Sequence, residues 1–227
     1  MKKIILSLFA ITIILVSCKK DELVAEMSTN ENDIDFSEVI VIDKNDNVLT
    51  SKKDFLEDGT ATVMEGYNEL ERKYILRFFT SIDELSNYAL ENEKYNVIYE
   101  RIKMINEIHA LGEVTGDLYL ENPTEDNISE EMKKLLKSFY NQESGKTNGK
   151  AILFDGVSHN GQSLGLLGNP MFSFGSFRNK ASSGLGLVIG NFLCSKRWFT
   201  GRYHFLLTSG IFTLDLMGFD NDAESGM

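Results

Sequence analysis

The sequence has few cysteines, a shortage of basic residues and no long apolar run after residue 17, and each shortage excludes a class of protein. Two cysteines in 227 residues cannot supply the dense disulfide framework of a small secreted scaffold. Lys plus Arg number 23 against 34 Asp plus Glu, a formal net charge of -11, so the chain would repel a nucleic-acid backbone and suits cations or basic partners better. A membrane-spanning helix needs roughly 18 apolar residues. The three widely separated histidines lack the paired spacing of a zinc site.

The segment at positions 1–17 is typical of an export signal. Two lysines precede the apolar stretch Ile4–Val16, which is too short for a permanent membrane-spanning helix. The stretch leads into Leu15-Val16-Ser17-Cys18, which resembles the lipobox of bacterial lipoproteins. The resemblance implies that residues 1–17 form a cleaved signal peptide and that Cys18 carries the lipid.

The residues after Cys18 indicate where in the cell the protein is located. Lys19-Lys20-Asp21-Glu22 resembles the surface-export signal of some Gram-negative lipoproteins. We therefore expect an outer-membrane protein that is exposed at the cell surface and touches the membrane only through its lipid anchor. Two alternatives stay open: a conventional cleaved signal with an incidental cysteine, and a lipoprotein of the inner leaflet.

Composition divides the rest of the chain into three parts. Residues 18–33 are polar and acidic and favour a flexible tether. Residues 34–148 combine strand patterns with helical ones, including a Ser-x-x-Glu capping box at Ser81 and an apolar stripe that ends near Gly112, so they predict an α+β domain of no recognisable type. Residues 149–227 are rich in glycine and aromatic residues and predict an all-β unit.

The all-β part contains an internal repeat. Leu153-Phe154 stands four residues before His159-x-Gly161, and Leu193-Cys194 stands at the same distance before Phe199-x-Gly201. A second pair of similar segments, 175–183 and 217–225, follows at nearly the same offset. The repeat predicts two similar halves of about four short strands each, which bury one core between them.

These repeated motifs resemble the βγ-crystallin fold, which a family of secreted peptidase inhibitors also uses. The family carries aromatic-x4-aromatic-x-Gly at a β-hairpin of each Greek key, and later [Asn/Asp]-[Asn/Asp]-x-x-[Ser/Thr]-Ser in a loop. Here His159 and Cys194 stand at positions that are aromatic in the family, whereas both glycines are present. The resemblance covers residues 150–227 and implies an all-β Greek-key sandwich behind the α+β region.

In that family the two loops supply oxygen ligands, crosswise, to two calcium ions, and hard oxygens are what calcium prefers. The first loop here is Arg178–Ser183 and the second is Asp220–Ser225. Crossed ligands would leave one weak calcium site, formed by Asp220, Asn221 and Asp222 of the second loop and Ser182 of the first.

The other calcium site is altered in both loops. Arg178 occupies the leading acidic position of the first loop, and Glu224 occupies the Ser/Thr position of the second. The resemblance therefore implies an ion pair between Arg178 and Glu224 where the family binds its second metal. The alternative is that both loops have lost the metal and only turn the chain.

The second half also ends early. Gly184–Ile189 supplies a closing strand after the first loop, but the second loop is followed at once by the end of the sequence, Ser225-Gly226-Met227. A missing strand would leave an open sheet edge, which invites pairing with another chain or with a strand of the α+β region.

Three other motifs have simpler explanations than chemistry. Gly161-x-Ser163-x-Gly165 matches the nucleophile elbow of α/β-hydrolases, but the residues after it exclude the required helix. Asp43-x-Asn45-x-Asn47 imitates an EF-hand loop, but it lacks the central glycine, so a turn is favoured. A basic aromatic cluster at 196–202 is either a binding edge or one hairpin.

Together these patterns predict a non-enzymatic surface lipoprotein. Its crystallin-like part would act as a binding or structural module for an envelope protein, with one calcium ion as its only cofactor. The alternative function is inhibition of a secreted peptidase by the same fold. The role of residues 34–148 is not predicted.

Overall fold

A computed structural model describes residues 38–50, 57–143, 151–154, 162–166, 171, 173, 179, 183–186, 190–207, 210–213 and 223–226. All of them belong to one unit, residues 31–227. The expected signal peptide, Cys18 and the tether up to residue 33 lie outside the described residues, so these stay predictions.

The first region contributes three strands and three α-helices, with short 3-10 turns between the helices. In chain order they are β1 (Val39–Ile42), β2 (Ala61–Asn68), β3 (Lys73–Phe79), α1 (Ile82–Glu91), η2 (Glu93–Tyr95), α2 (Asn96–Thr115), η3 (Asp117–Tyr119) and α3 (Glu130–Glu143). The α+β prediction for this region is confirmed.

Helix α1 begins where its capping box predicts. The Ser81 hydroxyl accepts a hydrogen bond from the Glu84 amide at 3.0 Å, which satisfies one of the amides that a helix start leaves unpaired. The predicted helix end at Gly112 is wrong, because α2 continues to Thr115 and ends at Gly116, which has a left-handed φ of 81°. Gly112 instead allows close packing, since a Cβ there would lie 2.7 Å from Leu118 Cγ.

The second region contributes short strands. They are β4 (Ala151–Phe154), β5 (Ser163–Leu166), β6 (Ser183–Gly186), β7 (Phe192–Lys196), β8 (Thr200–Leu206), β9 (Gly210–Thr213) and β10 (Ser225–Gly226), with one 3-10 turn, η6 (Arg197–Phe199), between β7 and β8. Within the described residues after 150, η6 is the only helical segment.

Two sheets organise these strands. The mixed six-stranded sheet has the order β1-β3-β2-β8-β7-β10, and the four-stranded sheet has the order β5-β4-β6-β9. Strand β2 of the first region pairs in parallel with β8 of the second, from Ala61 opposite Tyr203 to Met64 opposite Leu206. The six-stranded sheet therefore crosses the boundary that composition places near residue 149.

The expected missing strand at the end of the chain is wrong in one respect. Ser225 and Gly226 themselves form β10, which pairs with Cys194 and Leu193 of β7. The strand from the first region joins the other edge, at β8.

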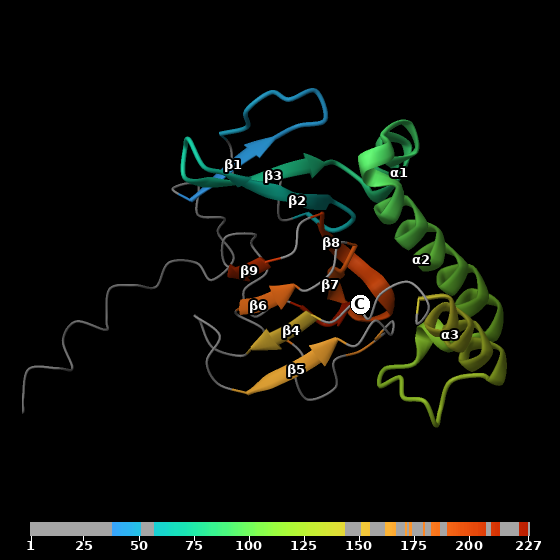
Figure 1. Cartoon of the computed structure of the whole chain (residues 1–227). Helices are drawn as coiled ribbons and strands as arrows, with labels where there is room; N and C mark the ends of the chain where they lie inside the picture. The colour runs from blue at the N-terminus through green and yellow to red at the C-terminus, as the bar shows by residue number, and fades with distance from the viewer. Residues whose placement is uncertain are drawn as a thin grey trace, which may run out of the picture. The chain divides into compact units, whose positions relative to one another are not determined.

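The helices and the two sheets form three layers with a core on each side of the six-stranded sheet (Figure 1). Side chains alternate along β7, as they must in a strand. Phe192 and Cys194 pack under the helices, whereas Leu193 packs with Leu153 and Leu164 of the four-stranded sheet. Each face of the central sheet is thus buried by a different layer.

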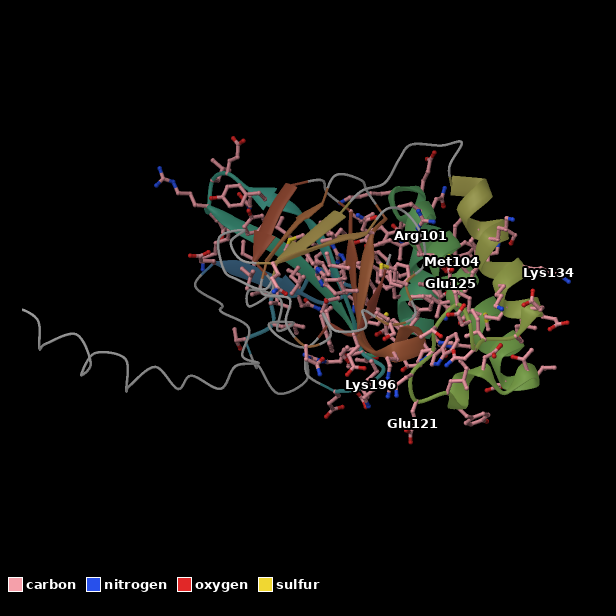
Figure 2. The ribbon with its side chains drawn as sticks, turned by 90° about the horizontal axis from the view of Figure 1, so that it is seen from below. Arg101, Met104, Glu121, Glu125, Lys134 and Lys196 are labelled. Carbon is pink, nitrogen blue, oxygen red and sulfur yellow. The ribbon has the colours of Figure 1, made fainter. Side chains whose placement is uncertain are left out.

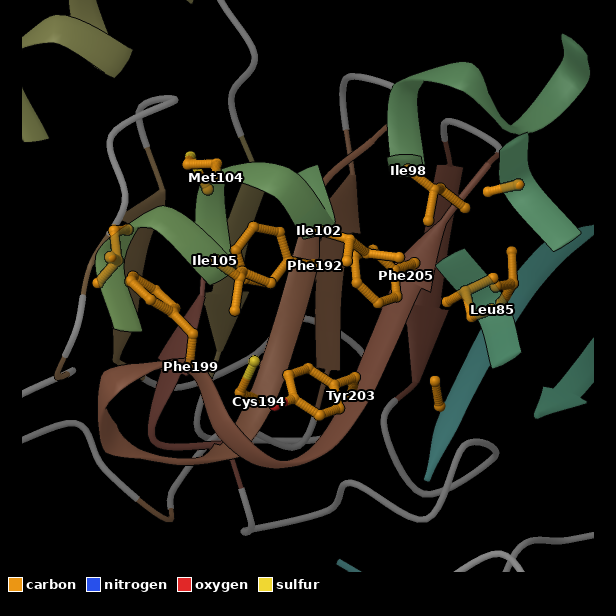
Figure 3. Close-up of a cluster of buried hydrophobic side chains, with 14 of the residues drawn as sticks. Leu85, Ile98, Ile102, Met104, Ile105, Phe192, Cys194, Phe199, Tyr203 and Phe205 are labelled. Carbon is orange, nitrogen blue, oxygen red and sulfur yellow. The ribbon is translucent and has the colours of Figure 1, made fainter. Parts of the chain in front are cut away.

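The core between the helices and the six-stranded sheet takes more of its buried residues from α2 than from any other helix. Figure 3 shows Ile98, Ile102 and Ile105 over Phe192 and Phe205 of the sheet, all with relative exposures of 1% or less. Figure 2 shows Arg101 and Met104 also on α2, both buried, while Lys134 of α3 extends away from the body. None of the helices in the described part of the chain is long and apolar enough to cross a membrane.

Candidate functional site

The turn between β7 and β8, residues 196–201, contains the second of the two predicted hairpin motifs, and we call it the folded hairpin. Trp198 and Phe199 have left-handed φ values of 59° and 56°, and Gly201 has a φ of 79°. A Cβ at Gly201 would overlap with Ser195 Oγ, so both the backbone conformation and the space require glycine. The role predicted for Gly201 is confirmed, whereas its counterpart Gly161 lies outside the described residues.

Ser225 closes the folded hairpin from the end of the chain. Its hydroxyl donates to the Lys196 carbonyl at 2.6 Å and accepts from the Phe199 amide at 3.2 Å. Ser195 Oγ accepts from the Arg202 amide at 2.8 Å on the other side of the turn. The bonds to the Phe199 and Arg202 amides are buried and the bond to the Lys196 carbonyl is partly buried, so these serine hydroxyls fix a conformation that the strands alone would not impose.

The first region also holds the folded hairpin. His109 Nε2 of helix α2 lies 2.6 Å from the Trp198 carbonyl oxygen. The Gly59 amide donates to the Gly201 carbonyl at 2.8 Å. Both contacts join segments that are far apart in the chain, and no local motif predicts either of them.

The basic aromatic cluster predicted at 196–202 is a hairpin rather than a free edge. Trp198, Phe199 and Arg202 are buried. Lys196 lies at the exposed end of β7 (Figure 2) and forms an ion pair with Asp58. The cluster therefore packs and pairs within the protein.

The loops of the two halves meet at Asn179 and Glu224, which together with Arg197 we call the loop junction. The Asn179 amide donates to the Ala223 carbonyl at 3.2 Å, and its side-chain Nδ2 donates to Glu224 Oε1 at 3.3 Å. Arg197 Nε lies 3.6 Å from Glu224 Oε2. Loops that are 45 residues apart are thus in contact.

The other residues predicted for the metal sites cannot be placed. Ser182, Asp220, Asn221, Asp222 and Arg178 all lie outside the described residues, so their roles stay predictions. Arg197 is a partner of Glu224 that sequence reasoning missed, although it belongs to the basic cluster that the sequence shows.

At Glu224 the described residues do not fit a calcium ion. Its carboxylate is paired with the Arg197 guanidinium and accepts a hydrogen bond from the Asn179 side-chain amide. The guanidinium charge repels a metal cation, and the amide NH₂ group cannot act as an oxygen ligand. Among the described residues no group of three or more His, Cys, Asp or Glu side chains is arranged to hold a metal.

A second polar cluster lies between the β1–β3 strands and the helices, and we call it the Arg77 network. Arg77 Nε donates to Glu65 Oε1 at 2.6 Å, and its two NH₂ groups donate to the Asp43 carbonyl and to Asp46 Oδ1, each at 2.7 Å. Tyr95 donates its hydroxyl to the same Glu65 oxygen. The side chains of Arg77 and Glu65 are only 7% and 11% exposed.

The Arg77 network keeps its members in fixed protonation states. Burial alone would raise the pKa of Glu65, but the hydrogen bonds from Arg77 and Tyr95 lower it by a larger amount. The pKa of Glu65 is therefore below its usual value. Burial lowers the pKa of Arg77, but hydrogen bonds to Glu65 and Asp46 raise it more. Burial and Glu65 together raise the pKa of Tyr95. An ionised pair with a neutral phenol suits a structural bond between layers.

The structure places two other sequence motifs, one in a turn and one in a strand. Asp43 Oδ1 accepts from the amides of Asn45 and Asn47 at 2.8 and 2.9 Å, so this carboxylate caps a turn, as favoured over an EF-hand. Ser163 lies in strand β5 opposite Phe154, not at the strand-to-helix turn that a nucleophile elbow needs.

No family model matches the chain, and no curated protein matches it. Among solved structures, a βγ-crystallin from an archaeon is similar to part of it, with 21% identity over 35% of this chain and 96% of that chain, and a TM-score of 0.32. Identity and score are both low, so the proposals below rest on the chain's own residues and strand order.

Proposed function

We propose that this protein is a surface lipoprotein of the bacterial outer membrane whose residues 149–227 form a non-catalytic binding or structural module of βγ-crystallin-like Greek-key topology. One observation carries the module: both halves have the same strand order. The four-stranded sheet has the order β5-β4-β6-β9. In the six-stranded sheet the corresponding four positions are taken by β8, β7, β10 and the single residue Met171, which forms a bridge with Gly226 of β10.

The fourth position of each sheet supports interlocked halves. Strand β9 comes from the second half but pairs with β6 of the first. Met171 comes from the first half but exchanges two backbone hydrogen bonds with Gly226 of the second, at 2.8 and 3.0 Å. Such an exchange of one strand between halves is what two interlocked Greek keys require.

The anchor rests on the sequence before residue 23 and has its own test. We expect the chain, produced in a Gram-negative host, to incorporate an alkyne-labelled palmitate, and Cys18→Ala to abolish the label. Protease added to whole cells should digest the body. Labelling of Cys18→Ala equal to the wild type would exclude the anchor, and protection from protease in intact but not in lysed cells would exclude surface display.

The calcium site is the finer part of the proposal. Asp220, Asn221, Asp222 and Ser182 would hold the ion through oxygen atoms, which would brace the two loops against each other. Isothermal titration of the full chain in detergent should show heat at millimolar calcium that Asp220→Ala removes. Glu224→Gln is the matched control, because Arg197 and Asn179 already surround that carboxylate. No heat at millimolar calcium excludes the site.

Peptidase inhibition is the alternative function for the same module. A panel of secreted metallo- and serine peptidases, assayed with excess protein, separates the two functions. A binding or structural module leaves every turnover rate unchanged. Stoichiometric loss of activity of one peptidase would favour the inhibitor.

A further inference from the structure

A pocket lies at the end of the ribbon that β1, β3 and β2 form. Strand β3 runs from the β2–β3 turn to α1, so this turn is at the end of the ribbon away from the helices (Figure 1). The pocket measures about 400 Å³ and is lined by Glu38, Tyr67, Arg72 and Tyr74. Its size is within the range of small-molecule sites.

Two tyrosine rings form the apolar part of the pocket. Tyr67 of β2 and Tyr74 of β3 are direct cross-strand partners, and their ring centroids are 5.0 Å apart with the planes at 67°. Tyr74 packs against the core between the sheets, whereas Tyr67 is 51% exposed. The sheet register thus fixes the pair while one ring stays available to a ligand.

Two charges of opposite sign complete the pocket. The Tyr74 amide donates to the Glu38 carbonyl at 2.9 Å, which holds the backbone of Glu38 beside the rings. Arg72 has a left-handed φ of 56° at the turn. Within the described residues, the Arg72 guanidinium and the Glu38 carboxylate have no hydrogen bond or ion pair with another side chain.

The chemistry of this set selects a class of ligand. An anion would be opposed by Glu38 and by the net charge of -11, and a cation would be opposed by Arg72. A neutral ligand with many hydroxyl groups can accept from the guanidinium and donate to the carboxylate, and both hydrogen bonds are strengthened by the charge. An aromatic ring offers a flat apolar surface for the carbon face of a sugar ring.

We propose that the pocket formed by Glu38, Tyr67, Arg72 and Tyr74 binds a neutral saccharide. The ring of Tyr67 would stack on one face of the sugar, and Arg72 and Glu38 would hydrogen-bond neighbouring hydroxyl groups. The pocket shares no residue with the loop junction, so the proposal holds whether or not the proposed module binds calcium.

The test is a binding measurement on the full chain in a detergent without a sugar head group. Saturation-transfer difference NMR with maltotriose, cellotriose and chitotriose as probes identifies a bound sugar, and titration calorimetry then gives its affinity. We expect Tyr67→Ala to weaken binding of that sugar by about tenfold, because the substitution removes the flat apolar surface on which the sugar would stack.

Two further variants test the rim. Arg72→Asn removes the guanidinium at a residue type that tolerates a left-handed φ, and Glu38→Gln removes the charge while it keeps the shape; each should weaken binding severalfold. Tyr119→Ala is the matched control, because Tyr119 is 80% exposed and does not line the pocket. This variant should bind the sugar with the same affinity as the wild type.

Three results would overturn the proposal. The first is no transfer signal from any of the three sugars. The second is an equal loss of affinity in Tyr119→Ala and Tyr67→Ala. The third is displacement of the sugar by millimolar glycine, acetate or methylammonium at an affinity above that of the sugar, which would mean that the pocket takes a charged ligand. Circular dichroism of each variant separates lost binding from lost folding.

Discussion

Thr62 Oγ1 and His204 Nδ1 lie 2.7 Å apart inside the six-stranded sheet, although 142 residues separate them in the chain. The two residues are direct partners in the parallel pairing of β2 with β8. His204 is fully buried, and burial lowers its pKa to about 3. A neutral imidazole therefore sits at the seam between the two regions of the chain.

This seam should make the protein sensitive to mild acid. The unfolded state binds a proton at His204 below about pH 6.5 and the folded state does so only near pH 3, so stability is fully present above pH 6.5 and falls as the pH drops. The loss from this one group is about 1.4 kcal/mol per pH unit. Urea unfolding between pH 7.5 and 4.5 measures it.

His204→Asn is the control for that measurement, because its amide keeps a polar atom near the Thr62 hydroxyl and does not titrate. The variant should be less stable than the wild type at pH 7.5 and should lose less on acidification. Parallel pH curves for the two proteins would contradict the assignment to His204.

Gly201→Ala should destabilise the folded hairpin more than a positive φ alone explains. The new Cβ overlaps with Ser195 Oγ and lies 3.0 Å from Lys196 Cγ. Gly116→Ala is a matched control with a φ of 81° and no atom within 4 Å of its Cβ. We expect about 1 kcal/mol for the control and about 3 kcal/mol for Gly201→Ala. Equal losses of unfolding free energy would show that the hairpin yields to the extra carbon.

Arg77→Met should cost about 3–5 kcal/mol, because it leaves the Glu65 carboxylate buried without its main partner. The second substitution in Arg77→Met/Glu65→Gln removes the stranded charge and should restore at least half of the loss. A double-mutant cycle in guanidinium chloride measures the coupling. Additive single effects would mean that the two side chains do not act as a pair.

Residues 149–227 alone should not fold as a stable monomer. Without the first region, strand β8 loses its partner β2, and Phe192, Phe199 and Phe205 lose their cover from α2. Exposed apolar surface of that kind favours aggregation. A dispersed NMR spectrum of the fragment, at a thermal midpoint close to that of the full chain, would refute the expectation.

Local features of the fold are readable from the sequence. The capping box at Ser81 and the glycine at position 201 act through contacts within a few residues of themselves or through backbone conformation, and both are where the residue types predict them. The repeat spacing also matches β5 with β8, since Ser163–Leu166 and Tyr203–Leu206 take corresponding places in their sheets.

Contacts between distant segments are not readable in this way. The pairing of Thr62 with His204 depends on which edge of the second half accepts a strand, and both residues look ordinary in their local sequence. The same applies to His109, whose contact with the Trp198 carbonyl requires that α2 cross the hairpin. The expectation for Gly112 is wrong for a related reason, since the role of this glycine is set by its packing against Leu118 beyond the end of α2 and not by the helix itself.

The parallel seam between β2 and β8 also constrains how the molecule assembles. The residues that complete it leave the ribosome, and cross any export channel, long after β2 has done so. Contacts of such high sequence separation slow folding, so the apolar side of α2 stays exposed until β7 and β8 have also been synthesised. The order of the strands therefore leaves the apolar side of α2 exposed during export, and a chaperone that covers this helix would prevent its aggregation.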